Sequence, residues 1–170
     1  MRVALLLRGV NVGGVTVRSA ELRALLAEAG LGEVATVLAS GNAVVTATDA
    51  AAAAGAAEAA LERRYGRRIQ VLGIAIESLA AIVADYPHGE DDEHTPYVVF
   101  ELEPGVAAEL AALEPGPGEA IAAGAAGVVH WSNPRGTTLT SPFAKALERT
   151  AKDRVTTRNV RTLRKVLAAA

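Results

Sequence analysis

The sequence predicts an α/β protein of the α+β type, made of two halves that each carry a small sheet. Three observations lead to this prediction. An apolar run at residues 3–7 is long enough for a central strand and ends at Arg8. Runs that favour strands then alternate with segments whose apolar residues recur at helical spacing. The acidic stretch at residues 88–94, which ends near Pro96, marks a boundary between the halves.

The first half begins with a strand, a loop and a helix. The helix has Ser19 or Thr16 as its expected cap and Gly30 or Gly32 as its expected end. The apolar residues that define its buried face are Leu22, Leu25, Leu26 and Ala29.

Two short β-favouring runs follow at residues 34–38 and 43–47, and the turn-forming residues 39–42 between them predict a hairpin. Asp49 should then cap an alanine-rich helix that runs to Tyr65, and Gly66 should close it. With a last strand at residues 69–74, the order is βαββαβ, which is the ferredoxin-like unit. We assign residues 1–76 to this half.

The second half is expected to be a degenerate ferredoxin-like unit at residues 97–170, after a helix and acidic linker at residues 77–96. Strands are predicted at residues 97–102 and 127–131, whereas residues 119–126 fit no single class. Helices are predicted at residues 79–86 and 106–113, from Ser141 with Pro142 in the first turn, and at the C-terminal end from Thr156 or Thr157.

The composition excludes several kinds of function. Seventeen basic against 19 acidic residues give a net charge of −2, so the chain as a whole does not attract nucleic acid or acidic lipid. The absence of cysteine excludes disulfides and thiolate sites, and it fits a reducing compartment. No apolar run is long enough for a membrane span. We therefore expect a cytoplasmic protein that has no membrane partner and no metal site.

The glycine-rich loop RGVNVGG, residues 8–14, follows the first strand and precedes the first helix. Glycines at such a place allow close approach of the backbone, and unpaired amides can bind an anion. The loop lacks the Lys-Ser/Thr ending of a Walker loop and the third glycine of a dinucleotide fingerprint, so it indicates no cofactor. A tight turn with no ligand explains the same glycines.

In the predicted topology this loop, the hairpin at residues 40–42 and the arginine-rich corner at residues 63–68 all lie at one end of the sheet. The corner would present an anion-attracting rim or only a solvated helix end. The segment at residues 156–165 predicts a basic amphipathic helix with Arg158 in its first turn, where a cation opposes the helix dipole and requires an anionic partner.

Three histidines offer little chemistry. His88 and His94 flank carboxylates, but no regular spacing sets a ligand geometry, so a solvated linker is the favoured interpretation. His130 has apolar neighbours and should be a packed strand residue. The pattern contains no recognisable Ser-His-Asp set, so the sequence assigns no catalytic residue and does not decide whether the chain is an enzyme.

The sequence LRGVNVGG at residues 7–14, followed by Leu22, the SGN of residues 40–42 and the TTRN of residues 156–159, resembles the bacterial family of domain of unknown function 1697. Ala39 stands where glutamine is common in that family, and Val160 stands where tryptophan is typical. The resemblance implies a bacterial cytosolic protein of ferredoxin-like architecture and brings no established activity.

From these motifs we expect one polar pocket for a small anionic or nucleotide-like ligand. Two arginines would neutralise charge, two glycines would donate backbone amides, and three asparagines would orient the ligand. One alternative is a nucleic-acid-binding or regulatory module, which the lack of an aromatic stacking pair in the first-half strands disfavours. Another is a structural or oligomerising protein. The predicted ligand-binding set is Arg8, Asn11, Gly13, Gly14, Ser40, Asn42, Arg158, Asn159 and Arg161.

Overall fold

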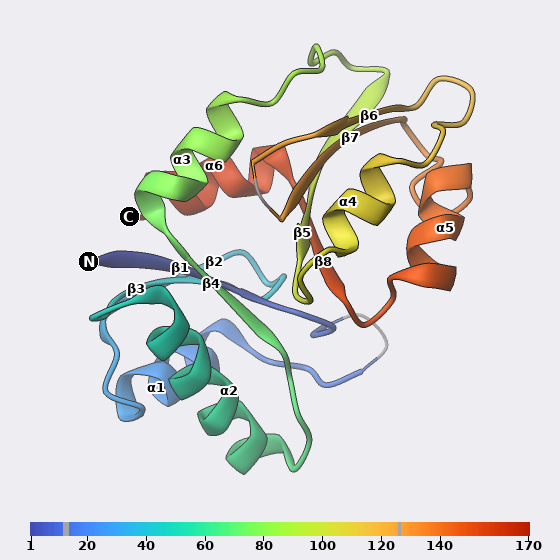
Figure 1. The fold of residues 1–170 in the computed structure, drawn as a ribbon. Coiled ribbons are helices and arrows are strands. Elements are labelled where there is room, and N and C mark those ends of the chain that lie inside the picture. Colours follow the sequence, from blue (N-terminus) through green and yellow to red (C-terminus); the bar gives the residue numbers. More distant parts are fainter. Residues whose placement is uncertain (12–13, 126) are drawn as a thin grey trace. The chain divides into compact units, whose positions relative to one another are not determined.

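The computed structural model describes residues 1–11, 14–125 and 127–170 (Figure 1). The chain forms two compact units. The first contains Met1–Ala81 together with Thr162–Ala170, and the second contains Ile82–Arg161. No helix in the described part of the chain has the length and apolarity that a membrane crossing requires.

The first unit has the predicted βαββαβ order, and its four strands form a sheet in the order β2-β3-β1-β4. Every neighbouring pair is antiparallel, so β1 and β2 point the same way with β3 returning between them. This is the expected ferredoxin-like arrangement. Its elements are β1 (Arg2–Leu7), α1 (Ser19–Glu28), β2 (Gly32–Val37), β3 (Asn42–Thr46), α2 (Ala50–Tyr65) and β4 (Val71–Ala75).

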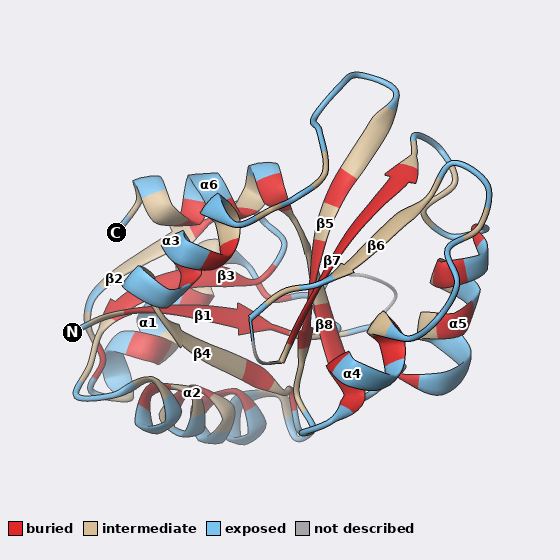
Figure 2. Cartoon of the chain, turned by 45° about the horizontal axis from the view of Figure 1, so that its top comes forward, coloured by how far each residue is buried: buried red, intermediate tan, exposed pale blue. Residues whose placement is uncertain are grey.

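The core of this unit lies between the sheet and the two helices α1 and α2, which cover one face (Figure 1). The side chains of Val3, Leu5 and Leu7 on β1 alternate toward these helices. Ala4 and Leu6 are also fully buried, so β1 is covered on both faces, as its continuous apolar run predicted (Figure 2). At Gly73 on β4, an added Cβ would overlap the backbone of Ala50, so the start of α2 lies directly on this strand.

The expected ends of α2 are confirmed, but the expected cap of α1 is wrong. The Asp49 carboxylate accepts the N–H of Ala52 at 2.8 Å, and Gly66 ends the helix with a φ of 69°. The N-cap of α1 is Arg18, not Ser19 or Thr16. The preceding residue, Val17, is bound through its backbone to the loop, and the helical conformation therefore begins only after Arg18.

The second unit repeats the same topology. Its sheet has the order β6-β7-β5-β8, and all neighbouring strands are antiparallel. A short strand, β6, occupies the part of the sequence that fitted no single class. The elements are β5 (His94–Glu101), α4 (Val106–Ala111), β6 (Ala120–Ala123), β7 (Val128–Pro134), α5 (Pro142–Thr150) and β8 (Val155–Asn159). Two further helices, α3 (Ile76–Ala84) and α6 (Val160–Ala168), contain the points where the chain passes between the units.

The second half is more regular than the degenerate βαββα order predicted for it, because Val155–Asn159 forms a strand and not the start of a helix. β-Branched residues suit a strand, and this one pairs with β5 so that Thr157 lies opposite Val99. Arg158 is therefore a strand residue, and the predicted conflict with a helix dipole is wrong. The last helix begins at Val160, and its cap is Asn159, whose Oδ1 accepts the N–H of Arg161 at 2.8 Å.

The acidic linker was predicted to extend to residue 96, but it ends before His94. Strand β5 begins at His94, and Thr95 and Pro96 already lie opposite β7. Ser141 caps α5 as expected, since its Oγ accepts the N–H of Ala144 at 3.2 Å.

Candidate functional site

The loop after β1 is shaped by two left-handed residues. Gly9 has a φ of 67° and Asn11 a φ of 61°. The N–H of Asn11 donates to the carbonyl of Val15 at 3.0 Å, and a short bridge joins Val10 to Val15. Gly13 lies outside the described residues. Gly14 is exposed, and a Cβ there would lie 3.3 Å from the carbonyl oxygen of Gly9, so the loop folds back on itself.

The side chain of Asn11 organises the loop. Its Oδ1 accepts the N–H of Val17 at 2.8 Å, while its Nδ2 donates to the carbonyl of Val17 at 3.1 Å and to the carbonyl of Ala39 in the hairpin. The amide therefore holds both ends of the loop together and ties the loop to the hairpin. The sequence offered no sign of this role beyond the tolerance of asparagine for positive φ.

The β2–β3 hairpin packs against the same loop. Asn42 is fully buried and its Nδ2 donates to the carbonyl of Val37 at 3.1 Å and to Ser40 Oγ at 2.9 Å. Gly41 has a φ of 75°, and a Cβ there would lie 2.5 Å from Val10 Cγ2. Leu7 N–H donates to the carbonyl of Gly41 at 2.8 Å. The first two predicted motifs are thus in contact, and Ser40 stays exposed beside them.

The N-terminus of α1 follows this loop, and its N-cap residue, Arg18, makes no side-chain hydrogen bond to the helix in the described part of the chain. Other helices of the chain differ. Asp49 caps α2 and Ser141 caps α5, each through a side-chain oxygen. Helix α4, which follows β5 as α1 follows β1, has Glu101 Oε2 as acceptor for the N–H groups of Gly105 at 3.1 Å and Ala107 at 2.9 Å. The first N–H groups of a helix require such acceptors, and at α1 the cap position carries an arginine.

Two of the four arginines of the arginine-rich corner pair with the chain's own carboxylates. Arg64 pairs with Glu21 at 2.6 Å, and Arg68 pairs with Glu58 at 3.6 Å. Glu58 also accepts the N–H of Val71 at 2.9 Å, which ties α2 to β4. These contacts favour the interpretation of the corner as a charged helix end.

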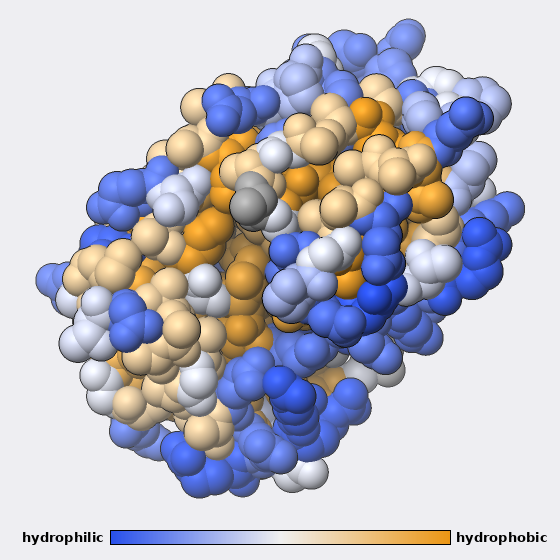
Figure 3. Space-filling model, viewed as in Figure 1, coloured by the Kyte–Doolittle hydropathy of each residue, from blue (hydrophilic) through white to orange (hydrophobic). Residues whose placement is uncertain are grey.

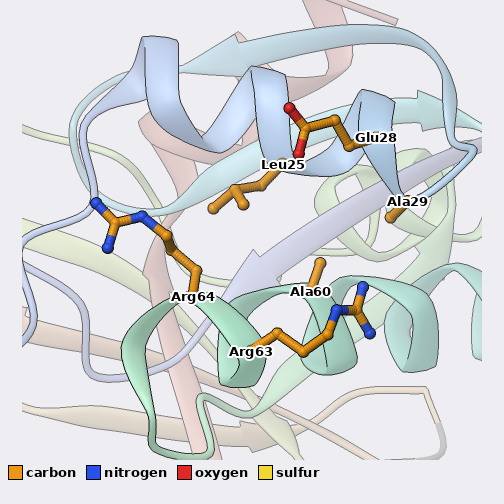
Figure 4. Close-up of a pocket in the computed structure, with 6 residues that line it drawn as sticks. All are labelled: Leu25, Glu28, Ala29, Ala60, Arg63 and Arg64. Carbon is orange, nitrogen blue, oxygen red and sulfur yellow. The ribbon is translucent and has the colours of Figure 1, made fainter.

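A shallow groove between α1 and α2, of about 210 Å³, contains two of these arginines (Figure 4). Its lining combines the apolar residues Leu25, Ala29 and Ala60 with Glu28 and the two arginines. The guanidinium groups of Arg63 and Arg64 point in opposite directions along it, so they do not converge on one anion (Figure 4).

The third predicted motif belongs to β8 and the start of α6 in the second unit. Arg158 Nη1 donates to Thr156 Oγ1 and to the carbonyl of Thr157, each at 2.9 Å. Burial of its guanidinium lowers the pKa of Arg158 to about 10, so the group remains a cation at neutral pH. Asn159 caps α6, and Arg161 is exposed and donates to the carbonyl of Asp91 at 3.3 Å.

The family model described as "Protein of unknown function (DUF1697)" matches residues 1–131 of the chain. The protein belongs to the DUF1697 family. The matched residues include the loop after β1 and the β2–β3 hairpin, and they end on β7, before the motif of β8. The resemblance inferred from the motifs is therefore confirmed.

This DUF1697 protein is also similar to a solved structure, "The structure of conserved bacterial protein SP0830 from Streptococcus pneumoniae". The two chains share 27% identity with a TM-score of 0.77, over 98% of this chain and 96% of that one. The predicted α+β fold is thereby confirmed. A search of curated proteins found no match.

His130 of the DUF1697 protein is a packed strand residue, as predicted. It lies on β7, is 1% exposed, and neither ring nitrogen has a hydrogen-bond partner among the described residues. A Cβ at Gly124 would lie 2.6 Å from its Nε2, and the Tyr86 ring meets it edge-on with 5.4 Å between centroids. Burial, and then the neighbouring His88, lower the pKa of His130, whereas Asp85 raises it.

We expect this histidine to make the protein less stable in mild acid. The unfolded chain takes up a proton near pH 6.5, whereas the folded chain resists protonation until a lower pH. The contribution of His130 is therefore constant above about pH 6.5 and declines as the pH falls toward the folded-state pKa. Urea unfolding at pH 7.5 and 5.5 should show a smaller pH difference for His130→Leu than for the wild type. The control is His94→Gln, at a half-buried site beside Asp91. The prediction is contradicted if the free energy of unfolding changes between the two pH values by the same amount in His130→Leu and in the wild type.

Proposed function

We propose that the first unit binds a small anionic ligand, of the phosphate or nucleotide type, at the N-terminus of α1. The observation that carries this proposal is the difference between two equivalent helices. At α4 a carboxylate of the chain, Glu101, accepts the first N–H groups, whereas α1 has no side-chain cap. Helix N-termini favour anions through their free N–H groups and the helix dipole. A bound anion at α1 would fill the role that Glu101 has at α4.

The residues around α1 suit this role. Arg18 at the cap position and Arg8 at the end of β1 supply positive charge close to the loop in the sequence. Gly13 and Gly14 would donate backbone amides. Because glycine has no side chain, an anion could approach the backbone closely at these positions. Ser40 would form the wall contributed by the hairpin, which the Asn11 amide holds against the loop, whereas the buried Asn42 would support this wall from inside.

Arg158, Asn159 and Arg161 of the second unit remain proposed ligand residues on the strength of their sequence motif. Arg158 is the strongest of the three, because its buried guanidinium keeps its charge at neutral pH. Its own variant, Arg158→Ala, should lose part of the ligand-induced stabilisation when it is measured beside the variants described below.

Thermal unfolding in the presence of inorganic phosphate, pyrophosphate, AMP and ATP tests the proposal. A ligand at 100 times its Kd should stabilise the wild type by about 2.7 kcal/mol. Arg8→Ala and Arg18→Ala should lose most of this shift. Arg149→Ala, an exposed arginine near the end of α5, is the matched control and should keep it.

Arg18→Asp gives a sharper result, because it supplies α1 with the side-chain cap that α2 already has in Asp49. We expect this variant to be more stable than the wild type by about 1 kcal/mol without ligand and to respond to none of the anions. Equal anion responses from the wild type, Arg18→Asp and Arg8→Ala would exclude the proposed site.

A further inference from the structure

Strand β6 is an edge strand whose outer side is open. It stands at the end of the order β6-β7-β5-β8, and its four residues pair with β7 in continuous register from Ala120 opposite Ser132 to Ala123 opposite Val129. None of the four carries a charge, and the strand contains no proline and no bulge. Natural proteins commonly protect exposed edges with such features.

Two of the other three sheet edges, β2 and β8, carry charged residues. Strand β2 has a register shift between Gly32 and Ala35, and Glu33 adopts a φ of 43° within it. Its carboxylate accepts from Thr46 at 2.7 Å, which places a charged group on that edge. Strand β8 carries Arg158. In contrast to β2 and β8, strand β6 has no charged residue and no register shift that would hinder pairing of its outer backbone groups with another strand.

The hydrogen-bond pattern identifies the open groups. Gly124 N–H donates to the carbonyl of Val128 at 3.0 Å, and residues of an antiparallel strand alternate between bonding inward and bonding outward. Ala122 and Ala120 therefore bond to β7, whereas Ile121 and Ala123 direct their N–H and C=O groups away from the sheet. Within the described residues no backbone group outside β7 pairs with these two.

A small apolar cavity of about 160 Å³ adjoins the end of this edge. It lies between α4 and the β6–β7 turn, and Ala107, Ala108 and Ala111 of α4 face Ala123 across it. Apolar side chains are visible at the surface in the region of β6 and α4 (Figure 3). The cavity is smaller than the roughly 300 Å³ at which small-molecule pockets begin, so a single aliphatic side chain fits it better than a free ligand does.

We propose that β6 binds an extended, uncharged peptide segment of a partner protein, which adds a fifth strand to the sheet and places one aliphatic side chain in the α4 cavity. A residue paired with Ala123 would project to the same face as Ala123, where the cavity lies. Main-chain bonds to Ile121 and Ala123 supply affinity, and the cavity supplies selectivity. A four-residue edge is far short of the roughly 800 Å² per partner of a standard stable interface, which favours a peptide over a second copy of the chain.

A phage-displayed library of random 12-residue peptides, selected on the full-length protein, tests the proposal. Selected peptides should lack charge in their central residues and should bind about tenfold more weakly to Ala123→Pro. This change removes the outward N–H of Ala123 and leaves the β6–β7 bonds in place. Ala108→Leu, which fills the cavity, should weaken binding similarly. The control Ala112→Leu, at the end of α4 outside the cavity lining, should not.

Amide exchange measured by NMR supplies an independent readout. In the free protein the amide protons of Ala120 and Ala122 should exchange slowly and those of Ile121 and Ala123 quickly, and a selected peptide should slow the latter pair. The proposal is overturned if no peptide is enriched, if enriched peptides bind Ala123→Pro and Ala108→Leu as well as the wild type, or if their binding leaves these two amides unprotected. A concentration-dependent dimer that Ala123→Pro abolishes would also overturn it, because the occupant would then be a second copy.

Discussion

Replacing Gly73 with alanine is expected to destabilise the first unit by about 3 kcal/mol, the upper end of what overpacking usually costs. The new Cβ would overlap the carbonyl oxygen of Ala50 and lie 2.9 Å from its carbonyl carbon and 3.2 Å from Ala54 Cβ. The obstacle is mostly helix backbone, which cannot rotate away as a flexible side chain can. Relief requires α2 to move off β4, and that movement would open the core between the sheet and the helix.

Gly55 provides the matched control in the same element. It lies in the exposed middle of α2, where an added Cβ meets nothing within 4 Å. Gly55→Ala should stabilise the protein by about 0.5–1 kcal/mol, because alanine is the better helix former. Urea titrations followed by circular dichroism measure both variants. A Gly73→Ala protein as stable as the wild type would mean that α2 does not rest on β4 in solution.

Removing the Glu119 carboxylate is expected to cost the second unit about 3 kcal/mol. Glu119 Oε2 accepts the N–H groups of Gly116 at 2.9 Å and Phe143 at 3.2 Å, and Oε1 accepts Trp131 Nε1 at 3.1 Å. One side chain thus joins the loop before β6, the start of α5 and the largest buried side chain. Glu119→Ala leaves all three donors without this acceptor, and hydrogen bonds to charged groups are worth about 1.5–3 kcal/mol each, with incomplete additivity.

Tryptophan fluorescence makes this prediction specific, because Trp131 is the only tryptophan. Both the emission maximum and the urea midpoint should change in Glu119→Ala. Glu114→Ala, five residues earlier in an exposed position, should leave both unchanged. An unaltered urea midpoint in Glu119→Ala would show that the three contacts contribute nothing net to stability.

The first unit was predictable from sequence because its local signals agree with its tertiary structure. The Asp49 cap and the Gly66 end of α2 are both local devices, and the apolar run of β1 reflects burial on both faces. The contact between loop and hairpin followed from topology alone, since a right-handed βαββαβ unit has one arrangement of its ends.

Elements whose conformation depends on distant partners were not predictable. Strand β8 carries residues that can also cap or start a helix, and its strand form is set by pairing with β5 more than 50 residues earlier. The alanine-rich β6 has no alternation to distinguish it from a helix, and only its register with β7 defines it.

The contact between the loop and the hairpin was predicted, but the roles of the side chains within it were not. Asn11 and Asn42 were expected to orient a ligand, and in the structure their amides bind backbone carbonyls of the loop and the hairpin. Which partner an amide finds depends on distances that sequence spacing does not contain. The uncapped start of α1 was hidden because Thr16 and Ser19 both look like caps, and only the backbone geometry shows that Arg18 holds that position.

The division of the chain into units has a consequence for synthesis on the ribosome. The first unit includes Thr162–Ala170, and Arg2 donates to the carbonyl of Ala169 at 3.4 Å. All of the second unit, Ile82–Arg161, is translated before this closing segment. The first unit can therefore be completed only after the whole of the second unit has been synthesised, although nascent chains usually fold from their N-terminal end. Until translation reaches Thr162, the emerging first unit is an unfinished body that chaperones could recognise.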